Sequence, residues 1–293
     1  MGLDKSDNFN FMNEIREVDI ELDNYLQEAK LIIDSWEKKN EEYLMQKYKK
    51  FHSTMQTFLK FYLMSLNLSI NRNKENWTKK EAWLTGINTV TFWRFRASYL
   101  IFKKGFPVES ISLLRGIFEN ILTTNALLKD IVNTENVFAD LPPNIDLLNK
   151  ELVAQELKKG AFKLNKRVKS TIIGNKSPLS LEARNFFEII FQLMHNSTHR
   201  SMINIIKHVF PWYQGKKLLS PLPLLEGEHL SVYINFSLYL SWIIINLLPK
   251  IYERGIDKLK PFDKNYNSLN RLFSKILDVD KNKKFIEEFI QSI

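Results

Sequence analysis

The sequence contains no cysteine, and it is poor in the two residues that most often interrupt helices. Without cysteine, the 293-residue chain cannot form disulfides, thiolate metal sites or iron–sulfur clusters, and it has no cysteine nucleophile. Glycine and proline number nine each, together about half their average share. So few turn-forming residues favour long helices over a many-stranded sheet. We therefore predict an all-α protein.

Several catalytic signatures are also missing. The chain has no glycine-rich phosphate loop, no dinucleotide-binding fingerprint, no His-Glu-x-x-His pair and no nucleophile elbow. Its N-terminus has no apolar leader, so we expect no secretory signal and a cytoplasmic location. A hydrophobic content of 44% argues against disorder and allows a sizeable core.

Charge is distributed unevenly along the chain. The net charge is +9, yet residues 1–50 carry 12 acids and 8 bases, so the rest of the chain is strongly basic. A basic body suits an anionic partner such as RNA or a nucleotide, although it can also simply keep a protein soluble.

Two heptad-spaced apolar seams occupy the N-terminal region, residues 1–70. The second seam is one residue out of phase with the first, which predicts either a helical hairpin or one long helical arm with a stutter. The arm either packs internally or joins two copies in a homodimer. The first seam comprises Ile15, Val18, Leu22, Tyr25, Ala29, Ile32 and Trp36, and the second Leu44, Tyr48, Phe51, Met55, Phe58 and Tyr62.

We expect a helical bundle core over residues 78–255. A helix over 79–104 should end at Gly105, and Pro107 should open a central helix over 107–131 that is apolar on nearly every face. Further helices are expected over 144–158, from Ser177-Pro178 to about 210, and over 229–254, with a loop at 211–228. Short amphipathic helices in 256–293 should pack on the bundle, with Asp280 capping the last.

Residues 231–249 carry no charge and are long enough to cross a bilayer. Asn235, Ser237, Ser241 and Asn246 interrupt the segment with polar groups. This pattern favours a helix buried within protein over a membrane span.

A polar ribbon marks the helix expected after Pro178. Glu188, Gln192, His195 and His199 recur every three or four residues, so they share one face of a helix whose flanks are apolar. Three interpretations stay open: a metal site with a third ligand, an acid–base site using histidine, or a structural polar seam. We expect that the protein binds neither a metal ion nor a cofactor.

Arg115 and Glu119 form a second polar pair, four residues apart on the apolar helix over 107–131. They are either an internal ion pair that fixes helix packing or an arginine presented to an anion and positioned by Glu119. Arg94 and Arg96, on the preceding helix, are further candidate anion ligands.

Residues 158–176 contain seven basic residues and no acid. Lys163, Lys166, Arg167 and Lys169 could contact a phosphate backbone, but the run is also typical of a solvated face. Phe162 is its only aromatic residue, so it lacks the pattern of a stacking platform for single strands.

Part of the chain, about 90–250, resembles a bacterial all-helical family catalogued as a domain of unknown function (number 5677). The similar stretches are Ala97–Leu100, Lys103–Ser110, Leu113–Glu119 and Met194–His199, with His195 where that family has Ser. The resemblance implies an all-helical fold and brings no assigned activity. A weaker analogy is to the HEPN helical ribonucleases of toxin–antitoxin and phage-defence systems, whose Arg-to-His spacing this chain lacks.

These observations predict a bacterial intracellular protein, related to defence or toxin systems, that acts on RNA or nucleotide phosphates without a metal. Arg115, Glu119, His195 and His199 should converge on one site between two central helices, because separately buried charges would be costly. The alternative is a non-catalytic interaction protein in which these polar residues are structural.

Overall fold

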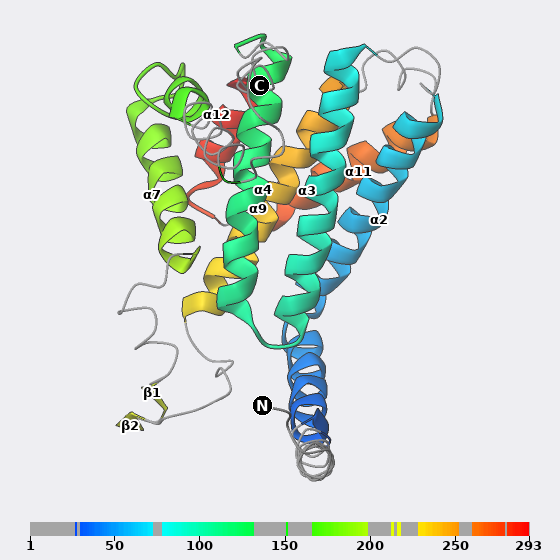
Figure 1. Cartoon of the computed structure of the whole chain (residues 1–293), viewed down its shortest axis with the longest axis vertical. Helices are drawn as coiled ribbons and strands as arrows, with labels where there is room; N and C mark the ends of the chain where they lie inside the picture. Colours follow the sequence, from blue (N-terminus) through cyan, green and yellow to red (C-terminus); the bar gives the residue numbers. More distant parts are fainter. Residues whose placement is uncertain are drawn as a thin grey trace, which may run out of the picture.

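The structure, a computed structural model, is a bundle of helices (Figure 1). It describes residues 27, 30–72, 78–131, 151, 166–198, 212–213, 216–217, 228–251, 260–278 and 280–292. The predicted all-α class is confirmed. Within the segment expected to be a loop, two two-residue strands, β1 Trp212–Tyr213 and β2 Lys216–Lys217, pair antiparallel. The labelled helices are α2 Lys49–Arg72, α3 Lys79–Lys103, α4 Pro107–Leu128, α7 Leu181–Thr198, α9 Glu228–Ile251, α11 Lys260–Ile276 and α12 Lys283–Ser292.

Local sequence signals set the ends of α3 and α4. The Thr78 side chain accepts a hydrogen bond from the Glu81 backbone N–H, and the Glu81 carboxylate accepts one from the Thr78 backbone N–H. Gly105 has a φ of 94°, a conformation that residues with a side chain rarely adopt. Pro107 is the first residue of α4. The predicted helix boundaries are confirmed here, except that α4 ends at Leu128 rather than at 131.

Helix α4 lies at the centre of the bundle, as its apolar sequence predicts. It packs against α3, α7 and α9, and Figure 1 shows it between α7 and α3. Burying one aliphatic or aromatic side chain stabilises a fold by about 1.5–3 kcal/mol, so α4 contributes much of the core. Its fully buried apolar side chains include Ile111, Leu114, Ile117 and Phe118.

Residues 30–72 run as one nearly continuous rod with no hairpin turn. Residues 30–47 are helical, and Tyr48 N–H donates to the Leu44 carbonyl at 2.9 Å. His52 N–H then donates to the Tyr48 carbonyl at 3.0 Å and carries the helix into α2. Helix α2 packs against α3, α9 and α11, so the second heptad seam serves internal packing. Its buried members are Leu44, Phe51, Met55, Phe58 and Tyr62.

Only the end of the first heptad seam lies within the described residues. The Trp36 ring packs edge-on against Phe106 at 5.3 Å between centroids, and Lys104 forms an ion pair with Glu37 at 3.2 Å. These contacts tie the arm to the turn between α3 and α4. Farther out, Ile32 is 64% exposed. Dimerisation through this seam stays a prediction.

The element order around α7 differs from the prediction. Residues 166–172 form a short helix, and a turn through 173–180 leads to α7. The expectation that Ser177-Pro178 opens the helix is wrong: α7 begins at Leu181, where Ser180 Oγ accepts a hydrogen bond from Ala183 N–H at 3.2 Å. The end predicted near 210, and the helix predicted over 144–158 apart from residue 151, lie outside the described residues.

The uncharged segment forms α9, which packs against α4, α11, α12 and α2. His229–Ile251 is long and apolar enough to cross a membrane, with a mean hydropathy of 1.5, but 72% of its most apolar window is buried inside the bundle. This burial fits the expected core helix rather than a membrane span.

Helices α11 and α12 close the chain against α9. Trp242 Nε1 donates to Asn270 Oδ1 of α11 at 2.6 Å, and Tyr239 OH donates to the Asp280 carboxylate just before α12. Asp280 also accepts from Asn282 N–H at 2.8 Å, so it caps the turn that opens α12. Described residues from α2 to α12 thus share one hydrophobic core.

Candidate functional site

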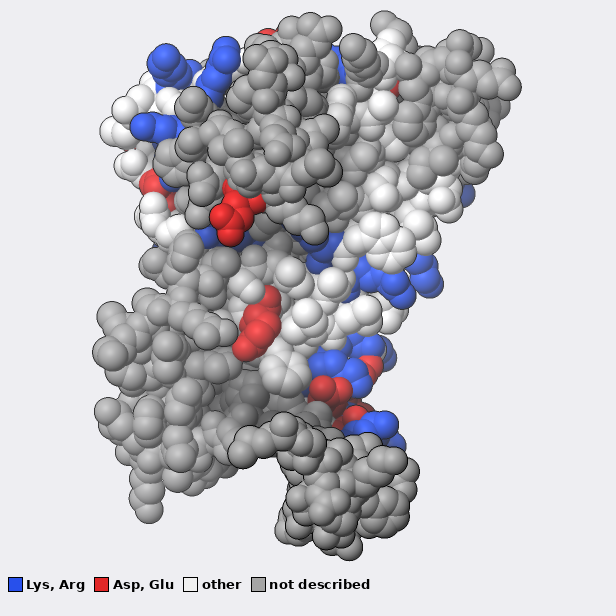
Figure 2. Space-filling view, in the orientation of Figure 1, with Lys and Arg blue, Asp and Glu red and all other residues white. Residues whose placement is uncertain are grey.

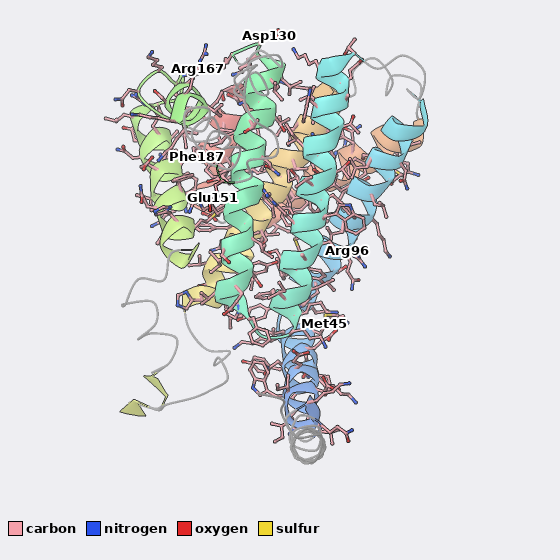
Figure 3. All side chains as sticks on the ribbon, viewed as in Figure 1. Met45, Arg96, Asp130, Glu151, Arg167 and Phe187 are labelled. Atoms are coloured by element: carbon pink, nitrogen blue, oxygen red, sulfur yellow. The ribbon has the colours of Figure 1, made fainter. Side chains whose placement is uncertain are left out.

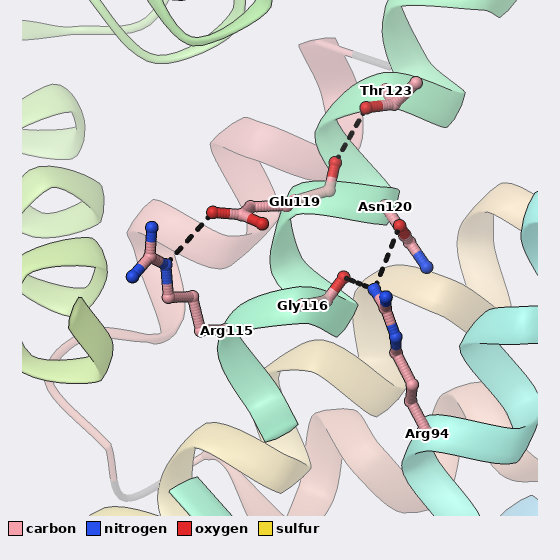
Figure 4. Close-up of polar contacts among 6 residues, drawn as sticks. All are labelled: Arg94, Arg115, Gly116, Glu119, Asn120 and Thr123. Carbon is pink, nitrogen blue, oxygen red and sulfur yellow. Dashed lines mark hydrogen bonds and ion pairs between the residues drawn. The ribbon is translucent and has the colours of Figure 1, made fainter. Parts of the chain in front are cut away.

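Arg115 and Glu119 project from α4 toward α7 (Figure 4). Arg115 Nε lies 3.0 Å from Glu119 Oε1, and the two side chains are 21% and 29% exposed. Thr123 Oγ1 donates to the Glu119 backbone carbonyl at 2.9 Å, one turn farther along. The ion pair expected from the four-residue spacing is therefore present, and the carboxylate holds the guanidinium in a fixed orientation.

The ring of Phe191, on α7, joins groups from three elements. Arg115 Cζ of α4 lies 5.5 Å from the ring centroid, and Lys169 Nζ of helix 166–172 lies 4.0 Å from it. The His195 ring stacks on the same ring, with centroids 6.3 Å apart and planes 14° apart. A cation over an aromatic face is attracted by the ring quadrupole, so Phe191 gathers two cations and an imidazole in one place.

Glu188, one turn before Phe191, anchors the second cation. Its carboxylate lies 2.9 Å from Lys169 Nζ and accepts a hydrogen bond from Gln192 Nε2 at 2.8 Å. Partial burial raises the pKa of Glu188, but hydrogen bonds from Gln192 and Lys169 outweigh burial and hold the pKa below its usual 4.5. The carboxylate is therefore ionised at neutral pH.

We call Arg115, Glu119, Lys169, Glu188, Phe191 and His195 the Phe191 cluster. Its charged side chains are between 21% and 44% exposed, so solvent reaches them. Two cations matched by two carboxylates, with an imidazole alongside, can bind an anion and move a proton. Among the described residues, no three His, Asp or Glu side chains are grouped to hold a metal ion. The absence of a metal stays a prediction.

Arg94, a residue of α3, contacts the face of α4 opposite to Arg115 and does not join this cluster. Its Nη1 donates to the Gly116 carbonyl at 3.1 Å and approaches Asn120 Oδ1 at 3.4 Å (Figure 4). A Cβ atom at Gly116 would lie 2.8 Å from that nitrogen, so glycine permits the close approach. Arg94 thus fastens α3 to α4, and its role as an anion ligand stays a prediction.

The remaining predicted cations lie in separate places. Lys166 and Arg167 are exposed on the short helix, and the exposed Arg96 lies over the Trp93 ring at 5.5 Å. Figure 2 shows separate groups of Lys and Arg on the visible face, and Figure 3 labels Arg96 and Arg167 on opposite sides of the bundle. The predicted cations thus form no single surface. Lys163 lies outside the described residues.

The structure brings together three of the four residues expected to converge. Arg115 and Glu119 share the Phe191 cluster with His195, whereas His199 lies outside the described residues. Sequence reasoning missed Phe191, which is one of the unnamed apolar residues that flank the polar ribbon. Its position four residues before His195 was the available signal.

Comparisons with family models, with curated proteins and with solved structures gave no match. The resemblance to the all-helical family and the analogy to HEPN ribonucleases therefore stay predictions. The geometry of the Phe191 cluster is the basis for a functional proposal.

Proposed function

We propose that the protein binds RNA or nucleotide phosphates at the Phe191 cluster and acts on them by acid–base chemistry. One observation carries the proposal: Arg115, Lys169 and His195, from three separate elements, meet around one partly exposed ring. In this scheme Arg115 holds the anion, Glu119 orients Arg115, and Lys169 supplies a second positive charge.

The planar guanidinium of Arg115 matches two oxygens of a phosphate group, and Lys169 adds a point charge. Glu119 and Glu188 compete with the incoming phosphate, which would favour ligands of high negative charge. The same two ion pairs hold Arg115 and Lys169 in position before a ligand arrives.

Cleavage of a phosphodiester needs a base that accepts a proton from the attacking hydroxyl and an acid that protonates the leaving oxygen. His195 can perform one of these transfers because its imidazole ring has one nitrogen that can accept a proton and one that can donate a proton. We assign the second transfer to His199, four residues farther along the sequence. Arg115 and Lys169 would stabilise the charge that develops on the phosphate.

Binding and cleavage of labelled RNA oligonucleotides and nucleoside triphosphates by purified protein test this proposal. Arg115→Gln and Lys169→Gln should each weaken binding about tenfold. Lys166→Gln is the matched control, because Lys166 is an exposed cation one turn before Lys169 on the same short helix, and the substitution should have little effect. His195→Ala should preserve binding and remove turnover.

If Lys166→Gln and Lys169→Gln weakened ligand binding equally, the binding would be nonspecific electrostatic attraction and not recognition at the Phe191 cluster. Failure of the parent protein to bind either ligand at physiological salt would reject the proposal.

A non-catalytic interaction protein is the second candidate. It is favoured by the ion pairing of both cations and by the exposed apolar residues on α3. In that case His195→Ala should lower the free energy of unfolding by about 1–3 kcal/mol, because a partner group would lose its hydrogen bond. The parent protein would show no turnover.

A further inference from the structure

An apolar stripe runs along the outer side of α3. Its residues recur at intervals of four and three, which is a heptad spacing. Val90, Trp93 and Leu100 are 47%, 53% and 47% exposed, while α3 packs on α4, α2 and α9 through its other faces. Among the described residues, no helix covers this face. We define the α3 stripe as Gly86, Val90, Trp93, Ala97 and Leu100.

The surroundings of the α3 stripe are basic. Residues 79–104 contain six Lys or Arg residues and a single acid, Glu81. Three of these cations, Lys80, Lys103 and Lys104, form ion pairs within the chain, and Arg94 binds the Gly116 carbonyl. Arg96 forms no ion pair with a described carboxylate and lies over the Trp93 ring. A helix that covers the stripe should therefore present an apolar heptad seam with acidic flanks.

The N-terminal segment of the chain has both properties. Residues 14–34 contain seven acids and two bases, and they include the first heptad seam, Ile15 to Trp36. Within the described part of this segment, Leu31 and Ile32 are 70% and 64% exposed. As helices, the seam from Ile15 to Ile32 and the α3 stripe would span roughly 25 and 20 Å, so their lengths match.

We propose that this acidic seam packs on the α3 stripe of a second copy of the chain. Residues 30–72 run as one rod that does not fold back on itself. The helix over 30–47 also leads away from the bundle (Figure 1). An exchange of arms between two copies makes two identical contacts related by a two-fold axis.

Trp93 is the anchor of this contact, because an exposed tryptophan beside an arginine is typical of residues that dominate interface affinity. Arg96 faces the acidic flank of the arriving helix. Attraction between the basic α3 and the acidic seam should weaken with salt, since rim charges are screened within about 8 Å at physiological ionic strength.

Light scattering coupled to size exclusion, across a range of concentrations, provides the first test. The parent chain should be a dimer, and Trp93→Asp should raise its dissociation constant about 30-fold or more. Ile189→Asp is the matched control, because Ile189 is 59% exposed on α7, away from α3. Arg96→Glu should weaken the dimer, and Glu21→Lys with Glu28→Lys in the same chain should restore it.

Engineered cysteines identify the occupant, because the natural chain has none. A mixture of Leu22→Cys and Val90→Cys chains, or of Leu22→Cys and Ala97→Cys chains, should form a disulfide-linked species of doubled mass. A monomeric parent would overturn the proposal. So would a disulfide formed within one chain that carries both Leu22→Cys and Val90→Cys, or efficient pairing of Leu22→Cys chains with each other and none with the α3 cysteines. Circular dichroism of each variant establishes that it remains folded.

Discussion

Two arginines in this protein lie at the same distance from an aromatic ring, 5.5 Å, in very different surroundings. Arg115 reaches across from α4 to Phe191 of α7 and is held by Glu119. Arg96 covers Trp93, three residues away on its own helix, with no carboxylate partner among the described residues. The Arg115–Phe191 contact joins two helices, whereas the Arg96–Trp93 contact lies on the surface of a single helix.

This difference shows how tertiary context changes the role of one kind of contact. The Phe191 cluster combines balanced charges, partial burial and a histidine, which suits chemistry on a small anion. The α3 stripe combines exposed apolar area with excess positive charge, which suits a second protein surface. We therefore propose ligand binding for the α4–α7 face and self-association for the α3 face.

Truncating the two aromatic rings should separate these roles most clearly. Phe191→Ala should lower the free energy of unfolding by about 3 kcal/mol, because the ring joins α4, α7 and helix 166–172. In dilute protein, where the copies are dissociated, Trp93→Ala should change it by no more than about 0.5 kcal/mol, because half of the Trp93 surface already faces solvent. Urea denaturation measures both. Equal losses would mean that the two faces do not differ in structural role.

Acid should destabilise the α2–α3 side of the bundle through His52. This side chain is 1% exposed, its Nδ1 lies 3.0 Å from Tyr99 OH, and burial lowers its pKa below the usual 6.5. Between pH 6.5 and that lower value the unfolded chain binds more protons than the folded chain, so the free energy of unfolding should fall as pH falls. Above pH 6.5 this effect should be absent.

Urea melts of parent and His52→Gln protein from pH 8 to pH 5 measure the effect. The variant should show a shallower pH dependence than the parent, and His229→Gln serves as a partly exposed control. Parallel curves for parent and His52→Gln would show that His52 does not carry the dependence.

The smallest expected effect is the coupling free energy between each arginine and its neighbour, Glu119 for Arg115 and Trp93 for Arg96. A double-mutant cycle on Arg115 and Glu119 should give about 0.5 kcal/mol, because both side chains retain access to solvent. A cycle on Arg96 and Trp93 should give a similar or smaller value, as exposed cation–ring contacts do. A coupling above about 2 kcal/mol for Arg115 and Glu119 would recast that pair as chiefly structural.

The candidate site was predictable in part. Arg115, Glu119 and His195 could be linked from sequence because charges on apolar helices need partners. Lys169 could not be linked to Phe191 and Glu188, because the turn through 173–180 decides how the short helix meets α7. Nor does the sequence around Arg94 show that its guanidinium will bind the Gly116 carbonyl of another helix.

The sequence by itself determined where several helices begin and end and which of them are central. Thr78 with Glu81, and Gly105 with Pro107, act through contacts within a few residues, so local chemistry is sufficient. Only the tertiary structure decided which apolar seams are covered: the seam from Leu44 to Tyr62 is buried, while the α3 stripe remains exposed. Periodicity shows that a helix has an apolar side, but what covers that side depends on segments distant in sequence.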